Sequence, residues 1–297
     1  MSKEFQTIAL VGLIGDVRVA EPMSLLADYL TKAGREVVAS EEIAAEIAAR
    51  AIREPEIAAN ADLIIAVGGD GTMLYAADLA GGGTVPLLGV NRGRLGFLTD
   101  VLPADMLESL DRVLGGDYVR ESRLLLEGRV ESADGSSRVA RALNDVVVHR
   151  RESGRMLDLE TRIAGRYVNT HSGDGLVVAT PTGSTAYALS CGGPIIEPVL
   201  DVVVLVPVCP HTLSDRPIVV PASQEIEVLL LDRQSTKAEV TADARSLGIF
   251  EPGERLTISA APDRVTLIHP PGHDFYEILR SKLHWGHDTR WREPKDS

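Results

Sequence analysis

Short apolar runs alternate with amphipathic helical patterns along the N-terminal part of the chain. In residues 7–13 a β-branched run leads into a loop, and residues 21–33 then carry apolar side chains at helical spacing up to Gly34. Such alternation of strand and helix is typical of a doubly wound parallel sheet. We expect strands at 7–13, 35–39, 63–67 and 85–90, and helices at 21–33, 41–50, 73–80 and 104–114.

The pattern changes after residue 123. Short alternating or β-branched runs, separated by turn residues, continue to residue 269 and indicate a mainly β domain. Residues 274–285 then have the apolar spacing of one amphipathic helix. We therefore predict a Rossmann-like α/β domain at 1–100, a larger β-rich domain at 101–274, and a C-terminal helix in 275–297 that packs back on a core. The strands expected in the second domain are 124–130, 139–148, 156–163, 167–169, 176–179, 202–208, 217–220, 226–231, 238–241, 255–259 and 265–268.

A glycine-rich segment, Gly68-Gly69-Asp70-Gly71-Thr72, directly follows the apolar run at 63–67. Loops at the carboxyl ends of parallel strands form the usual ligand crevice of open α/β sheets. We expect the three glycines to take positive φ and to bring backbone N–H groups close to a phosphate, with Thr72 capping the next helix. The segment is thus predicted to be a phosphate-binding loop made of Gly68, Gly69, Gly71 and Thr72.

Asp70 is the unusual residue of this loop. A carboxylate repels phosphate unless it binds a metal ion or accepts a proton from an attacking hydroxyl, which makes Asp70 a candidate general base. The alternative is that Asp70 only shapes a turn, because Asp and Gly are common turn residues. The position directly after a buried strand favours the catalytic interpretation.

The charge balance restricts the class of partner. The net charge of −13 argues against nucleic-acid binding, which needs a basic surface. No apolar run approaches the roughly 20 residues of a membrane span, so we expect no membrane insertion. Two cysteines, Cys191 and Cys209, cannot build a disulfide framework, and no signal-peptide pattern opens the chain, so we expect a cytoplasmic protein.

An acidic chain must hold an anionic ligand with local positive groups. The candidates are Arg92, Arg94, Arg150, Arg151 and Arg155, and the alternative for each is a solvated surface arginine.

Two further segments carry polar side chains next to predicted strands. The segment 180–187 reads Thr-Pro-Thr-Gly-Ser-Thr-Ala-Tyr, and we expect a helix to begin at about Ser184. Its four hydroxyls can cap that helix or bind sugar and phosphate oxygens, whereas capping alone would use one or two. Asn144-Asp145 precedes a strand and offers donors and acceptors for an adenine edge or a ribose diol, although a dipeptide of this kind is more often a turn.

Taken together, these motifs resemble the NAD kinase family. The glycine-rich Asp loop, Asn91-Arg-Gly-Arg-Leu-Gly-Phe-Leu-Thr-Asp100, Asn144-Asp145, Asp174-Gly175 and the segment 180–187 occur in the family's order and spacing over essentially the whole chain. The first loop alone is shared with diacylglycerol and sphingosine kinases and, more distantly, with phosphofructokinases. The later motifs separate the families.

The resemblance implies a transferase of NADP biosynthesis. It would move the γ-phosphoryl group of ATP to the adenosine 2′-hydroxyl of NAD, with a divalent cation such as Mg²⁺ as cofactor and Asp70 as proton acceptor. NAD and ATP are the implied partners, and a homodimer or homotetramer is the implied assembly. The implied NAD-binding residues are Asp70, Gly71, Phe97, Asn144, Asp145, Arg155, Asp174, Thr185, Ala186, Tyr187, Ala188, Leu189, Ser190 and Arg245.

Some positions depart from the family pattern. Members usually have Asn-Glu where this chain has Asn144-Asp145, and Asp-Gly-Gln where it has Asp243-Ala244-Arg245. Ser172 replaces a basic residue found in some members.

The sequence locates neither the metal ligands nor the ATP site, because no Gly-x4-Gly-Lys-Ser/Thr segment occurs. His269 and His273 are separated by Pro-Pro-Gly, so they cannot share a helical face, and a metal site there is not expected. Two other classes stay open: a lipid or sugar kinase with the same loop, and a non-catalytic NADP(H) sensor. Polyphosphate as donor and NADH as acceptor are also undecided by the sequence.

Overall fold

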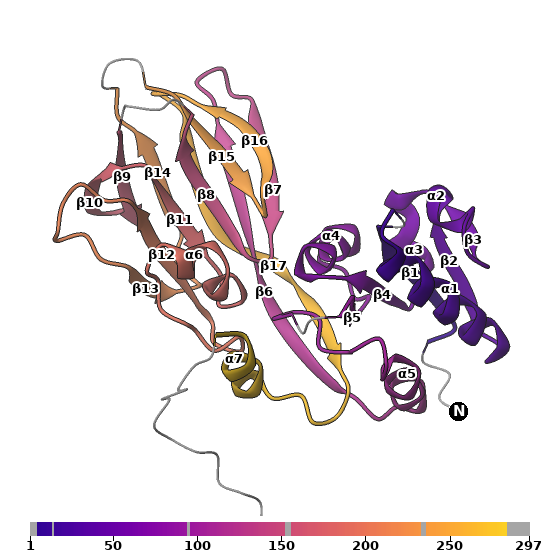
Figure 1. Ribbon diagram of the computed structural model, residues 1–297. Helices are drawn as coiled ribbons and strands as arrows, with labels where there is room; N and C mark the ends of the chain where they lie inside the picture. The colour runs from indigo at the N-terminus through magenta and orange to yellow at the C-terminus, as the bar shows by residue number, and fades with distance from the viewer. Residues whose placement is uncertain (1–4, 14, 94–95, 152–155, 233–235, 284–297) are drawn as a thin grey trace, which may run out of the picture. The chain divides into compact units, whose positions relative to one another are not determined.

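The computed structural model describes residues 5–13, 15–93, 96–151, 156–232 and 236–283 (Figure 1). Packing divides the chain into two units. The first contains residues 1–80, 85–121 and 267–297, and the second contains residues 81–84 and 122–266. The chain thus returns to the first unit at its end, and the strands β6 (Val119–Glu131) and β17 (Arg255–His269) each begin in one unit and end in the other.

A parallel sheet forms the centre of the first unit. Its order is β3 (Arg50–Ile52), β2 (Glu36–Ser40), β1 (Thr7–Gly12), β4 (Leu63–Gly68) and β5 (Leu87–Asn91), and the end of β17 joins β5 in parallel. Every residue of β4 and β5 is buried, as expected for strands covered on both faces. The prediction of a doubly wound α/β domain is therefore confirmed.

The helices of this unit are short except for α1 (Val17–Lys32), α4 (Asp70–Ala80) and α5 (Met106–Gly115). Met23, Leu26 and Leu30 of α1 pack with Leu110 and Val113 of α5 in one core against the sheet. Helix α1 begins earlier than predicted because Asp16 caps it and accepts a hydrogen bond from the Arg18 N–H at 3.0 Å. The remaining helical elements are α2 (Glu41–Ala44), η1 (Glu54–Glu56), α3 (Ile57–Asn60) and α7 (Phe275–Leu283).

One predicted helix is wrong. The segment 41–50 forms a single turn, α2, and Arg50 then starts the strand β3, which pairs in parallel with β2. The segment is rich in alanine, but Ile43 is the one buried residue of its helical turn. Pairing of the chain at the sheet edge overrides the local helix propensity.

The second unit is a β-sandwich with one core between its two sheets. One sheet contains β10 (Arg166–Gly173), β9 (Leu157–Ile163), β14 (Ile226–Leu230) and β17, with β6 and β7 (Ser137–Ala142) beyond. The other has the order β13 (Ile218–Pro221), β12 (Val202–Val208), β11 (Gly175–Ala179), β8 (Asp145–Arg150), β15 (Ala238–Ala242) and β16 (Arg245–Phe250). The predicted β-rich domain and the C-terminal helix are confirmed.

Two strand predictions need correction. The run 139–148 is two strands, β7 and β8, because the backbone N–H groups of Leu143 and Asn144 donate to the Asp243 carboxylate instead of to a neighbouring strand. The runs 255–259 and 265–268 belong to one continuous strand, β17. In addition, β16 has no strong strand pattern and is absent from the sequence prediction.

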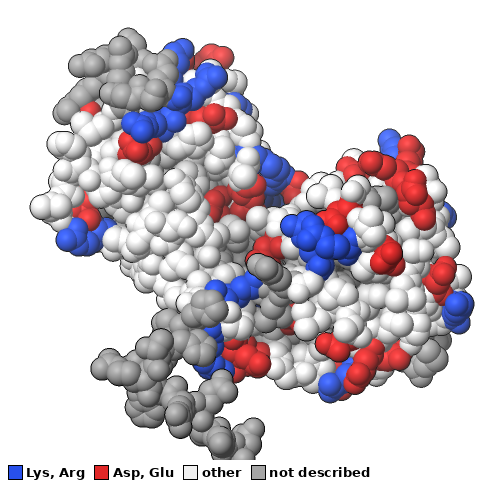
Figure 2. Space-filling model, viewed as in Figure 1, with Lys and Arg blue, Asp and Glu red and all other residues white. Residues whose placement is uncertain are grey.

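Charge is distributed without a dominant basic field on the face shown in Figure 2. Figure 2 shows acidic side chains mainly over the first unit, with basic ones among them, whereas much of the visible surface of the second unit carries neither. None of the helices in the described ranges combines the length and the apolar character that crossing a bilayer requires.

Candidate functional site

The order of the strands in the first unit places the glycine-rich loop at a switch point of the sheet. Strands β1 and β4 are neighbours, and the connections leave β1 in one direction and β4 in the other. The carboxyl ends of such strands border the ligand crevice of open α/β folds. Strand β4 ends at Gly68, and after Gly69 the chain reaches Asp70, the first residue of α4.

The helix begins before Thr72, so the prediction that Thr72 caps it is wrong. The Gly69 carbonyl accepts hydrogen bonds from the N–H groups of Thr72 at 2.9 Å and Met73 at 3.3 Å, which places Gly69 at the cap position. The prediction of positive φ at Gly68, Gly69 and Gly71 is also wrong, because none of the three has a positive φ. Gly68 is needed for space instead, because a Cβ there would collide with the Thr72 side chain.

The Asp70 carboxylate is held by the next loop of the same unit. Its Oδ2 accepts the Phe97 N–H and its Oδ1 accepts the Leu98 N–H, each at 3.0 Å. Gly96 permits this approach, because a Cβ on it would collide with Asp70 Oδ1. The loop is braced in turn by Asn91, whose Nδ2 donates to Thr99 Oγ1 at 2.7 Å. Asp70 is thus fixed in direction, and its carboxylate reaches a surface hollow.

That hollow has a volume of about 560 Å³ and a polar lining. Three basic side chains line it: Arg92 after β5, Arg18 in the first turn of α1, and Lys282 near the end of α7. Asp16 contacts both arginines, with Arg18 Nη2 at 2.7 Å and Arg92 Nη1 at 3.3 Å from its Oδ2. Arg92 is among the predicted cations, whereas Arg18 and Lys282 lie far from any motif. The hollow therefore combines one carboxylate with several cations, as an anionic ligand requires.

The second unit brings three predicted segments to one end of a sheet. The register pairs Asp145 of β8 with Ala179 of β11 on one side, and Val146 with Ala242 of β15 on the other. The neighbouring strand ends therefore bring together Asn144, Thr180 and the turn 243–244. This end of the sheet, called the sheet edge below, is joined by a hydrogen bond from the Thr180 N–H to the Asn144 carbonyl at 2.8 Å. Arg245 follows the turn, and its Nη2 donates to the Arg141 carbonyl at 3.0 Å.

The segment 180–187 forms no long helix. A 3-10 turn, η2 (Thr182–Thr185), leads into a single α-turn, α6 (Tyr187–Ser190), so the helix predicted from Ser184 is wrong. Gly183 presses against the Asn144 backbone, and a Cβ there would collide with the Asn144 carbonyl. Figure 1 shows α6 beside β11 and β12, where Ala188 packs on Val177 and Val206.

All four hydroxyls of this segment have protein partners. Thr180 Oγ1 donates to the Leu143 carbonyl at 2.5 Å, Ser184 Oγ to the Pro181 carbonyl at 2.6 Å, and Thr185 Oγ1 to the Thr182 carbonyl at 3.2 Å. Thr182 Oγ1 accepts Arg123 Nη1 at 3.2 Å. Two of the hydroxyls thus stabilise the turn itself, and the other two bond to Leu143 and Arg123, which are distant in the sequence.

A pair of buried carboxyl groups lies at the same sheet edge. Asp243 accepts the N–H groups of Leu143 and Asn144 at 2.7 and 2.8 Å, and that of Asp145 at 3.2 Å. Burial and the nearby charge of Asp243 raise the pKa of Asp145 to about 7. Burial also raises the pKa of Asp243, although these backbone hydrogen bonds oppose the rise. Asp243 was not among the predicted site residues, because an Asp in a hairpin turn resembles any other turn residue.

The remaining predicted residues have different positions. Asp174 lies in the turn before β11, at the opposite end of that strand, and forms an ion pair with Arg150 at 3.1 Å. Tyr187 of α6 is 45% exposed. Burial raises the pKa of Tyr187, with smaller contributions from Cys191 and from the charge of Asp174. Phe97 belongs to the first unit with Asp70. Arg94 and Arg155 lie outside the described residues.

These features first define a class. An α/β unit with an acid-bearing glycine loop at the sheet switch point, joined to a β-sandwich with a polar loop edge, is the architecture of a nucleotide-dependent phosphotransferase.

Comparison with known proteins specifies the family. Residues 16–118 match the ATP-NAD kinase N-terminal domain, and residues 143–270 match the ATP-NAD kinase C-terminal domain. The NAD kinase of Nitrosococcus oceani is 44% identical over 289 residues, which cover 96% of this chain and 99% of that protein. The NAD kinase of Hahella chejuensis is 45% identical over 286 residues, covering 95% and 97%. The chain belongs to the NAD kinase family, and its activity is the phosphorylation of NAD to NADP with ATP as the family's phosphoryl donor.

Solved structures agree on the fold. Yeast NADH kinase in complex with NADH superposes with a TM-score of 0.91 at 23% identity, covering 99% of this chain and 91% of that one. An NAD kinase from Archaeoglobus fulgidus in complex with ATP has a TM-score of 0.72 at 27% identity, covering 93% and 99%.

Proposed function

We propose that this NAD kinase uses Asp70 to accept the proton of the adenosine 2′-hydroxyl of NAD while that oxygen attacks the γ-phosphorus of ATP. A bond forms between the 2′-oxygen and the γ-phosphorus, the bond from that phosphorus to the β–γ bridging oxygen breaks, and ADP leaves. The observation that carries the proposal is the fixed Asp70 carboxylate, which two backbone N–H groups orient at the edge of a cation-lined hollow. Phosphoryl transfer depends mainly on such positioning and on charge neutralisation.

The same hollow is proposed to bind the phosphates of ATP. Arg18, Arg92 and Lys282 offer cationic donors from three different elements, and such donors neutralise the charge that spreads over the phosphoryl oxygens. This assignment supplies the ATP site that the sequence left without a location.

A divalent cation fits this arrangement when the phosphates carry it. Mg²⁺ prefers oxygen ligands and commonly binds through one or two carboxylates and substrate phosphates. Asp70 is the one carboxylate among the described residues that line the hollow, so the protein offers no closed cage there. Bound Mg²⁺ would neutralise phosphate charge, and Asp70 is the side chain of this lining that could help to hold it.

We assign NAD binding in the second unit to the sheet edge and to α6. Asn144, Asp145 and Arg245 meet at that edge, and Thr185, Ala186, Tyr187, Ala188, Leu189 and Ser190 form the adjoining turn and helix. The carboxyl of Asp145 is shorter than the usual Glu but lies at the strand end that the motif requires. Asp174, Phe97 and Gly71 complete the proposed contacts within their own units.

The experiment is an assay of the purified chain with NAD, ATP and Mg²⁺, read by an NADP-specific dehydrogenase. We expect NADP carrying a 2′-phosphate by phosphorus NMR, and loss of turnover when a chelator removes Mg²⁺. Turnover of ATP with diacylglycerol or a sugar phosphate but not with NAD would contradict the proposal. Tight NADP binding without any turnover would indicate a sensor instead. Parallel reactions with polyphosphate and with NADH determine the donor and acceptor range.

A further inference from the structure

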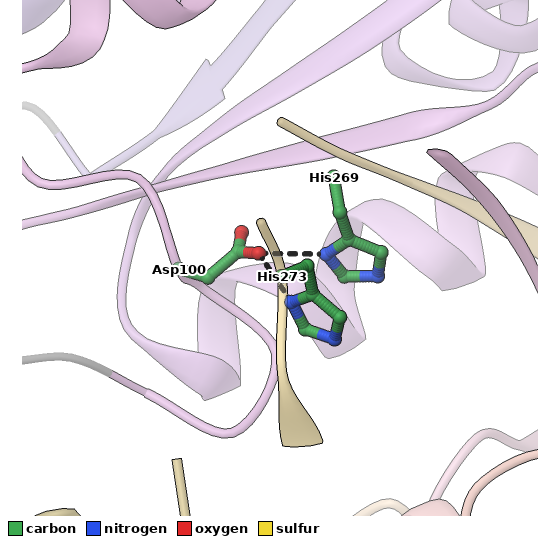
Figure 3. A group of neighbouring side chains, drawn as sticks. All are labelled: Asp100, His269 and His273. Carbon is green, nitrogen blue, oxygen red and sulfur yellow. Dashed lines mark hydrogen bonds and ion pairs between the residues drawn. The ribbon is translucent and has the colours of Figure 1, made fainter. Parts of the chain in front are cut away.

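Two histidines and two carboxylates gather in the first unit, away from Asp70 in the sequence. Figure 3 shows His269 and His273 stacked with their Nδ1 atoms directed at Asp100. The distances from Asp100 Oδ2 are 2.8 Å to His269 Nδ1 and 2.7 Å to His273 Nδ1, and the ring centroids are 3.7 Å apart. Glu121 Oε2 lies on the other side of both rings, 3.3 Å from His269 Nε2 and 3.8 Å from His273 Nε2.

The cluster joins segments that are distant along the chain. Asp100 follows β5, Glu121 lies in β6, His269 ends β17, and His273 precedes α7. The sequence argued against a metal site because the two histidines cannot share a helix. A strand end followed by a Pro-Pro-Gly turn nevertheless places both imidazoles on one carboxylate, an arrangement that helix spacing cannot indicate.

The orientation of the rings is that of metal-bound imidazoles. A metal-ligating histidine binds through one ring nitrogen and donates the other N–H to a carboxylate, which fixes the tautomer. Here both rings direct Nδ1 to Asp100 and Nε2 to Glu121. A neutral imidazole has one N–H, so a neutral ring can donate to only one of the two carboxylates that face its nitrogens. A cation on the Nδ1 side uses those lone pairs and leaves both Nε2–H groups for Glu121.

Burial and charge also favour a cation. His269 is 2% exposed, and Asp100, Glu121 and His273 are 11–14% exposed as side chains. Asp100 Oδ1 is buried and accepts no hydrogen bond from the described residues. A hollow of about 240 Å³ adjoins Asp100 and His273, with Asp105, Asp274 and Glu277 in its lining. The hollow gives room for a water ligand, and its acids attract positive charge.

We propose that Asp100, His269 and His273 form a binding site for a divalent transition-metal ion of the Zn²⁺ class, with Glu121 as the carboxylate that orients both rings. The three ligand atoms lie within 4.8 Å of one another. Zn–N and Zn–O bonds of about 2.0–2.2 Å in tetrahedral geometry require ligand atoms about 3.3–3.5 Å apart, so the hydrogen-bonded atoms must open by about half an ångström. Nitrogen ligands select Zn²⁺ over Mg²⁺, so this site is separate from the cation of phosphoryl transfer.

We infer that the metal has a structural role. It would connect the end of β17 and the start of α7 to Asp100, which is close in sequence to Leu98, and the Leu98 N–H holds the Asp70 carboxylate. Loss of the ion is therefore expected to loosen the loop that orients Asp70, without removing any group from the reaction.

The test measures metal binding directly. Tag-free full-length protein is treated with a chelator, dialysed, loaded with Zn²⁺ or Co²⁺ and analysed for metal content and for the Co²⁺ absorption spectrum. We expect one ion per chain, a tetrahedral Co²⁺ spectrum with imidazole ligands, and a higher melting temperature with Zn²⁺ than with Mg²⁺. Glu121→Gln should weaken Zn²⁺ binding by about 10–100-fold, and His273→Gln by at least as much. His211→Gln, at an exposed histidine outside the cluster, and Asp70→Asn should bind Zn²⁺ like the unchanged chain.

Two results would overturn the proposal. One is unchanged Zn²⁺ affinity in His273→Gln, which would mean that the ion binds elsewhere. The other is failure of the unchanged chain to retain Zn²⁺ or to give the tetrahedral Co²⁺ spectrum, and this result decides the question even if the substituted proteins do not fold. Because Asp70→Asn is included, failure of this site and failure of the proposed catalytic role are distinguishable.

Discussion

Asp145 illustrates how one carboxyl group links stability to pH. Its pKa of about 7 in the folded chain compares with an ordinary value of 3.8, because the group is buried beside Asp243. Below pH 3.8 the carboxyl is protonated in both the folded and the unfolded chain, so it does not lower the free energy of unfolding. Between pH 3.8 and about 7 the unfolded chain ionises first, so folding becomes less favourable as the pH rises, and the loss is complete above pH 7.

Asp145→Asn removes this titration and should stabilise the ligand-free protein at alkaline pH. We expect the free energy of unfolding at pH 8 to rise by roughly 1–3 kcal/mol, and the gain to vanish toward pH 4. Urea unfolding at a series of pH values measures both. Asp134→Asn is the control, because hydrogen bonds from Ser136 lower the pKa of that exposed carboxyl, so its removal brings no gain at pH 8. A gain for Asp145→Asn that is independent of pH would contradict the assignment.

The turn between β15 and β16 carries backbone strain. Asp243 and Ala244 have φ of 46° and 64°, the left-handed conformation of a two-residue hairpin turn that favours Gly. Family members usually have Gly at the position of Ala244. The departure seen in the sequence thus has a conformational meaning in addition to its place near the proposed NAD site.

Ala244→Gly should therefore stabilise the chain. Relief of the left-handed conformation is worth about 1 kcal/mol, which corresponds to a rise of about 2–4 °C in melting temperature. Differential scanning calorimetry without ligand measures the change. Ala140→Gly, in the extended backbone of β7, is the matched control and should lower the melting temperature. Equal effects of the two substitutions would show that the turn is unstrained.

At the scale of elements, the cation-lined hollow is built by α1, α4, α7 and the loop after β5. Arg92 is exposed and paired with Asp16, so we expect a moderate contribution to the proposed phosphate binding. Arg92→Gln is expected to raise the KM for ATP by roughly 5–20-fold, with a smaller change in the KM for NAD. Steady-state kinetics with each substrate varied in turn provides the measurement.

Arg53→Gln, at an exposed arginine of the same unit outside the hollow, should leave both constants unchanged. Comparable rises in the two substituted proteins would exclude a local role for Arg92.

Elements with strong periodicity could be predicted from the sequence, and those that depend on distant partners could not. The buried run at 63–67 and the alternating strands of the second unit are specified by their own residues. Strand β3 forms because it pairs with β2 at the edge of the sheet. The chain breaks between β7 and β8 because the N–H groups of Leu143 and Asn144 donate to the Asp243 carboxylate. No local pattern shows either interaction.

Some residues of the candidate site could likewise be predicted from the sequence, and others could not. Asp70 and Arg92 stand in recognisable motifs, whereas Arg18, Lys282 and Asp243 enter only through the fold. The hydroxyls of the segment 180–187 appeared available for a ligand in the sequence, but each has a protein partner in the structure. Donor and acceptor groups can be counted from a sequence, while their existing partners cannot.

For the whole molecule, the assembly stays a prediction. We expect a homodimer or homotetramer from the family resemblance and from a β-rich unit with sheet edges, since edge strands offer unpaired N–H and C=O groups. Light scattering coupled to size exclusion should give a mass of two or four chains at micromolar concentration. A mass of one chain over the whole concentration range would contradict this expectation.

Our central claim is that the two units provide different parts of the proposed site. The first unit supplies Asp70 and the cations of the hollow, and the second supplies most of the proposed NAD contacts. Removal of the proton acceptor should therefore slow the chemical step and leave dinucleotide binding intact.

The most direct measurement is single-turnover phosphorylation of NAD by Asp70→Asn, with NAD affinity measured on the same protein. The exposed Asp78 of the same helix gives the matched control, Asp78→Asn. We predict that Asp70→Asn loses at least about 100-fold in rate at unchanged NAD affinity, the usual effect of a lost general base, while Asp78→Asn keeps both. A rate for Asp70→Asn within a few-fold of the unchanged chain would contradict the assignment of Asp70 as the proton acceptor.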